Sequence, residues 1–81
     1  MEIKLIQGYF TPEDSIDILT KMINIKIEYH ESKIDKSSNE EDIKMREERI
    51  KLLQKDLASA KKYIEQQDSK IAFTGDIHLY E

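Results

Sequence analysis

Apolar and polar residues follow two different periods along this chain, and the periods divide it into four segments. At the start, Ile3 and Leu5 alternate with polar Glu2 and Lys4 until Ile6 breaks the alternation, which predicts a short strand over Glu2–Ile6 that ends at Gln7 and Gly8. Near the end, Thr74-Gly75-Asp76 has the composition of a turn, and alternation resumes at Ile77, which predicts a second short strand. The long region between follows the spacing of three and four residues that is typical of helices.

A first helix is predicted from Pro12 to about Lys36. Thr11 is a favourable N-cap, and Pro12 falls at the first helical position, where its missing N–H costs nothing. No proline or glycine interrupts the residues from Glu13 to Lys36.

A second helix is predicted to begin in "SSNEED" and to run to about Lys70. Ser38 with Glu41, or Asn39 with Asp42, forms a capping box. Only a few polar residues separate the two helices, so we expect antiparallel neighbours. The strands then lie at the same end of the hairpin, where they pair within one chain or across a dimer.

The second helix carries a heptad repeat of large aliphatic residues. Its members are Ile43, Ile50, Leu57, Ile64 and Ile71. A repeat sustained over this length predicts a left-handed coiled coil with the first helix.

The first helix has two apolar stripes. The inner stripe faces the second helix and consists of Ile16, Leu19, Ile23, Ile27, His30 and Ile34. The outer stripe lies about 130° around the helix and consists of Ile18, Met22, Ile25 and Tyr29. A two-helix hairpin covers only one stripe, and soluble monomers seldom leave such a patch bare. We therefore expect the outer stripe to be a self-association or partner surface, with two hairpins forming a homodimeric four-helix bundle. The alternatives are docking of another protein, or a monomer whose termini fold far along the helix.

One polar layer is expected inside the aliphatic seam. His30 belongs to the inner stripe, and a turn near Ser38 places it opposite Arg46 and Glu47. A polar layer of this kind fixes register at some cost in stability. If Glu47 is closer, the charged imidazole is favoured, and if Arg46 is closer, the neutral form is favoured.

Composition and charge limit the number of domains, the location and the partners that we expect. The 81 residues fit a single domain over positions 1–81, the chain has no cysteine, and its formal net charge is −4. The first residues do not resemble a signal peptide, and no apolar run reaches the length of a membrane span, so we expect a cytoplasmic protein without a membrane partner. Acidic and basic residues are interleaved, which argues against a nucleic-acid partner.

The sequence has little that indicates chemistry. The serines lack a histidine and an acid arranged to activate them, and the phosphate-binding glycine motifs are absent. No helical pair of metal-ligating residues includes His30. We therefore predict no enzyme, no cofactor, no metal and no small-molecule substrate. The functional prediction is a non-catalytic interaction or scaffold module. The first alternative is a small nucleic-acid-associated regulator, and the second is a metal- or pH-responsive helical dimer at His30.

Overall fold

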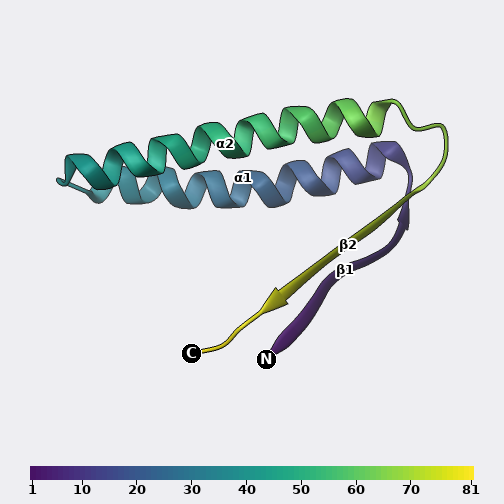
Figure 1. The fold of residues 1–81 in the computed structure, drawn as a ribbon, viewed down its shortest axis with the longest axis horizontal. Helices are drawn as coiled ribbons and strands as arrows, with labels where there is room; N and C mark the ends of the chain where they lie inside the picture. Colours follow the sequence, from purple (N-terminus) through teal and green to yellow (C-terminus); the bar gives the residue numbers. More distant parts are fainter.

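The fold is a helical hairpin with a two-stranded ribbon at its open end. A computed structural model describes all residues from Met1 to Glu81. The elements are β1 (Glu2–Phe10), α1 (Pro12–Lys36), α2 (Glu40–Glu65) and β2 (Ile71–His78). Figure 1 shows the helices side by side and the chain termini together at the far end of the ribbon. The predicted mainly α architecture in the order β-α-α-β is confirmed.

The first helix has the predicted bounds because its start signals are local. The hydroxyl of Thr11 accepts a hydrogen bond from the backbone N–H of Asp14 at 3.1 Å. Pro12 occupies the first turn, where it needs no donor. The helix then continues without a break to Lys36.

The second helix uses Asn39 as its N-cap, the second of the two predicted registers. The Asn39 side-chain oxygen accepts hydrogen bonds from the backbone N–H groups of Glu41 at 2.9 Å and Asp42 at 3.1 Å. Two free amides of the first turn are therefore satisfied by a single side chain.

The second helix ends at Glu65, so the prediction that it reaches Lys70 is wrong. The backbone N–H of Gln66 donates to the carbonyl of Tyr63 at 3.3 Å, which tightens the last turn. Ile71 continues the heptad in sequence but lies in β2, opposite Phe10. Strand pairing at the hairpin base therefore overrides the helical period.

Half-buried aliphatic residues line the seam between the helices. From α1 they are Ile16, Leu19, Ile23, Ile27 and Ile34; from α2 they are Ile43, Ile50, Leu53, Leu57 and Ala60, with Ile64 fully buried. The inner stripe and the heptad thus form one face each, as amphipathic helices do when they pack as a pair.

The two strands pair antiparallel within the chain over a longer range than predicted. The ladder runs from Glu2 opposite His78 to Phe10 opposite Ile71. Leu5 is an extra residue in β1, between the pair Lys4–Asp76 and the next pair along the ladder. This bulge explains why Ile6 breaks the simple alternation of the first five residues.

The predicted turn at Thr74-Gly75-Asp76 is wrong, as is the end of the first strand at Gln7 and Gly8. Thr74 lies opposite Gln7 and Gly75 opposite Ile6, so both segments continue through these positions. Gly8 adopts a φ of 153°, which residues with a side chain rarely adopt. A β-carbon at Gly75 would lie 3.3 Å from a methyl carbon of Ile6. These glycines thus serve a twisted, closely paired ribbon.

The ribbon has one apolar face. Cross-strand partners point to the same side, which places Ile3, Ile6 and Phe10 with Ile71, Phe73 and Ile77. The rings of Phe10 and Phe73 meet edge to face at 6.1 Å near the helix base. Both strands contact α1, and Figure 1 shows the ribbon leaving the base at an angle to the helices. Only the proximal part of the apolar face is therefore covered.

The chain by itself has almost no interior. Ile64, at 6% exposure, and Ser15, at 0%, are the two buried residues of the 81. The hydroxyl of Ser15 has no hydrogen-bond partner. The molecule exposes 6656 Å² and measures 47 × 31 × 13 Å, so it is a thin plate rather than a sphere.

Candidate functional site

A polar layer crosses the hairpin seam near the turn. The guanidinium of Arg46 lies 3.1 Å from Nδ1 of His30, and its Nε lies 3.1 Å from a carboxylate oxygen of Asp42. All three side chains are half-buried. A guanidinium has no acceptor, so the contact with His30 is a hydrogen bond only when Nδ1 carries no proton. In this arrangement the proton of the neutral imidazole lies on Nε2.

Two of the three residues predicted for the polar layer lie together, and a residue that was not predicted completes the layer. His30 and Arg46 meet across the seam, whereas Glu47 is exposed and makes no hydrogen bond or ion pair. Asp42 takes the position expected for an acid. The i,i+4 spacing of Asp42 and Arg46 on one helix predicts this ion pair, and the prediction needs no knowledge of the partner helix.

Tyr29 extends the layer onto the outer surface of α1. Its ring packs edge-on against His30 with centroids 5.5 Å apart. Lys33 Nζ lies 5.7 Å and the Arg46 guanidinium carbon 5.8 Å from the ring centroid, distances at which cation–π attraction operates. The ring therefore connects the polar layer to the outer stripe.

Replacing His30 by leucine should raise the free energy of unfolding by about 1 kcal/mol, because apolar surface is buried and Arg46 keeps Asp42 as its partner. Chemical denaturation measures this change. Glu31→Leu is the matched control, since Glu31 is exposed and should leave stability nearly unchanged. A loss of stability in His30→Leu would show that the hydrogen bond to Arg46 outweighs the added packing.

The outer stripe is only partly covered by the chain itself. Ile18 and Met22 are half-buried, whereas Ile25 is 68% exposed and Tyr29 is 53% exposed. Both strands contact α1, but the far half of the stripe remains open. Two of the four large side chains in the row, Ile25 and Tyr29, are thus available to a partner.

Further apolar surface lies at the far end of the ribbon. Ile3 and Ile77, which face each other on its apolar side, are each 37% exposed, and Leu5 and Leu79 are each 51% exposed. The open part of the outer stripe and the open part of the ribbon are therefore both apolar.

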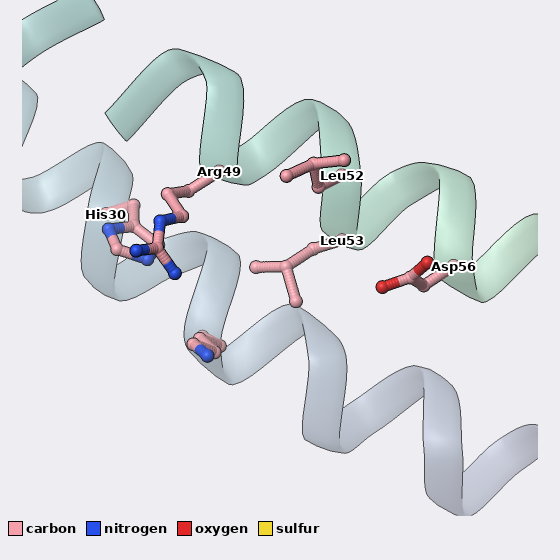
Figure 2. A pocket seen from close by; sticks show the side chains of 6 residues that line it. His30, Arg49, Leu52, Leu53 and Asp56 are labelled. Atoms are coloured by element: carbon pink, nitrogen blue, oxygen red, sulfur yellow. The ribbon is translucent and has the colours of Figure 1, made fainter. Parts of the chain in front are cut away.

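The hollows on the hairpin are small and mixed in charge. A groove of about 190 Å³ lies between the helices, lined by Lys26, His30, Arg49, Leu52, Leu53 and Asp56. Figure 2 shows Arg49 reaching from α2 toward His30, with Asp56 farther along the same helix. A second hollow of about 330 Å³ involves α2 alone, around Leu52 and the exposed residues Glu48, Lys51 and Lys55.

One group of potential metal ligands lies outside the residues considered from sequence. Glu2, Asp76 and His78 share the polar face of the ribbon, and their donor atoms lie within 4.8 Å of one another. Nδ1 of His78 lies 3.9 Å from a carboxylate oxygen of Glu2. All three are exposed, and Lys4 lies on the same face opposite Asp76. His30 belongs to no such group, and its neighbour is a cation.

Comparison with known proteins gives no match among family models, curated proteins or solved structures. Neither helix has an apolar stretch long enough to cross a lipid bilayer.

Proposed function

We propose that this chain is a non-catalytic interaction module whose working form is a homodimer built on α1, with the two hairpins packed as a four-helix bundle. The observation that carries this proposal is the exposed surface of the single chain.

A single chain exposes more surface than a compact globular protein of the same mass. A globular protein of 9.6 kDa is expected to expose about 5,100 Å², whereas this chain exposes 6656 Å². The difference, roughly 1,600 Å², is about twice the area that one partner buries in an interface of standard size. The radius of gyration, 15.3 Å, also exceeds the value of about 11.7 Å expected for a compact chain of this length.

The excess surface includes a large apolar part on α1 and the ribbon. Exposed large side chains there include Ile25, Tyr29, Ile3 and Ile77. Each one that a partner covers contributes roughly 1.5–3 kcal/mol when fully buried. With two buried residues the chain lacks the interior that usually stabilises a domain of this size, and oligomerisation supplies it. A second copy is favoured as the occupant because it carries the same open apolar stripe and is present wherever the chain itself is present.

The hairpin offers a geometry for this dimer that is common among helical proteins. Its inner seam already has the spacing of a coiled coil, and the outer stripe has the same steps of three and four. Two hairpins that share their outer stripes place four helices around one apolar centre. The charged faces and the polar side of the ribbon then remain outside for further partners.

Sedimentation of the full chain tests the proposal. We expect a species of twice the single-chain mass at concentrations of about 10–100 µM, dissociating on dilution as mass action requires. A single species of 9.6 kDa throughout that range would contradict the proposal. Light scattering on the same samples checks that the mass does not depend on an assumed shape, because the molecule is elongated.

A further inference from the structure

We infer that the two copies of α1 pack antiparallel, with their midpoints at Ile25 and with Lys21 of each copy beside the partner's Glu28. This inference rests on the proposed homodimer and adds the direction and register of its central interface. It is carried by the charges that flank the outer stripe.

The two flanks of the stripe carry different charges. Asp14, Lys21 and Glu28 recur every seven residues and therefore lie along one flank, with both signs represented. Lys26 and Lys33, also seven residues apart, lie along the other flank and are both positive. The stripe itself runs between them and has Ile25, its most exposed aliphatic member, near the middle of α1.

An antiparallel pair brings like flanks together, because a twofold axis perpendicular to the helices relates the copies. With the midpoint at Ile25, Lys21 comes level with the partner's Glu28 to within about 1.5 Å of helical rise. This pair of opposite charges forms twice by symmetry. Asp14 comes level with the partner's Lys36, also twice. One unfavourable meeting, Lys26 beside the partner's Lys26, is left on the other flank, where long stems carry the charges outward.

A parallel pair brings opposite flanks together and fits the charges less well. Lys21 then lies beside the partner's Lys26, and Glu28 lies beside the partner's Lys33. Each meeting occurs twice, so attraction and repulsion balance. Interhelical charge pairs at flanking positions select helix orientation in this manner, and here they select the antiparallel pair.

The groups that this interface needs are accessible in the single chain. Lys21 makes an ion pair with Asp17 at 3.1 Å, but the two side chains are 73% and 60% exposed, so the ammonium can also serve a second carboxylate. Glu28 is exposed and makes no ion pair within the chain. Ile25 is free of tertiary cover over most of its surface.

Charge reversal at Lys21 separates the two orientations by the sign of its effect. In the antiparallel dimer, Lys21→Glu places a carboxylate beside the partner's Glu28, and we expect the dissociation constant to rise about 5–10-fold relative to Lys21→Gln. Lys21→Gln is the reference because it also loses the pair with Asp17. Adding Glu28→Lys to Lys21→Glu should restore the affinity of Lys21→Gln or better. In a parallel dimer, Lys21→Glu would bind more tightly than Lys21→Gln, because it would lie beside the partner's Lys26.

Disulfide formation gives a second measurement that does not depend on charge. The chain contains no cysteine, so a single introduced thiol reports only on its own symmetry mate. Ile25→Cys should form a covalent dimer on mild oxidation, whereas Ile18→Cys should not, because its two copies are about 21 Å apart along the helix axis in the antiparallel register. Equal crosslinking of Ile18→Cys would overturn the antiparallel arrangement. A wild-type chain that sediments as a monomer would instead overturn the dimer itself.

Discussion

Replacing Ile25 by glutamate should convert the proposed dimer into a folded monomer. Ile25 is 68% exposed in the single chain and lies at the centre of the outer stripe. Each copy then loses roughly 1.5–3 kcal/mol of apolar burial, and two carboxylates are brought together in the interface. We expect the dissociation constant to rise about 100-fold or more, as measured by sedimentation equilibrium.

Leu52→Glu is the matched control for this variant. Leu52 is 56% exposed and lies on α2, so it offers a side chain of similar size and exposure outside the outer stripe. It should leave the dimer intact. If Leu52→Glu dissociates the dimer as strongly as Ile25→Glu, or if Ile25→Glu leaves it unchanged, the interface does not involve the outer stripe. Circular dichroism of both variants confirms that the helices are retained.

The second large effect is expected at Ile64, which is the one buried apolar residue of the chain. It ends the heptad on α2 and lies next to Glu65, the last residue of that helix. Ile64→Ala removes buried methyl and methylene groups at a site with few neighbours able to move in, which costs about 2–4 kcal/mol. Thermal denaturation at fixed protein concentration should show a fall in Tm of more than about 10 °C.

Leu52→Ala provides the comparison for Ile64→Ala on the same helix. It removes the same kind of side chain from an exposed position and should change stability by less than about 0.5 kcal/mol. Equal losses in the two variants would mean that stability comes from helix propensity rather than from packing at the hairpin base. A small loss of stability in Ile64→Ala would indicate that the main stabilising contacts lie between chains rather than within one chain.

Local signals predicted the start of both helices, and long-range pairing decided what the sequence missed. Thr11 and Pro12 act within one turn of helix, so α1 begins where the sequence indicates. The aliphatic side chain of Ile71 suits both a heptad position of a helix and an apolar position of a strand. Its role is set by Phe10, sixty-one positions away in the chain but opposite it in the ribbon. A single-sequence period contains no information about that partner.

Gly75 shows the same limit for turn signals. Thr74-Gly75-Asp76 has the composition of a turn, but the ladder continues through it. The glycine is explained by the methyl of Ile6, which would lie 3.3 Å from a β-carbon at this position. In the polar layer, the heptad placed Arg46 opposite His30 correctly, since both belong to the seam. Asp42, one turn before Arg46 on the same helix, completes the layer, and the i,i+4 spacing of an acid and a base is the local signal for this contact.

The bulge at Leu5 makes the two free edges of the ribbon unequal. A sheet of two strands has no central strand, so each strand leaves one row of backbone groups unpaired. On β1 the extra residue interrupts the spacing of that row, and an incoming extended segment loses register there. On β2 the row has no such interruption from Ile71 to His78. Strand addition, whether by a peptide or by misassembled copies during folding, therefore has one favoured side on this molecule, the outer edge of β2.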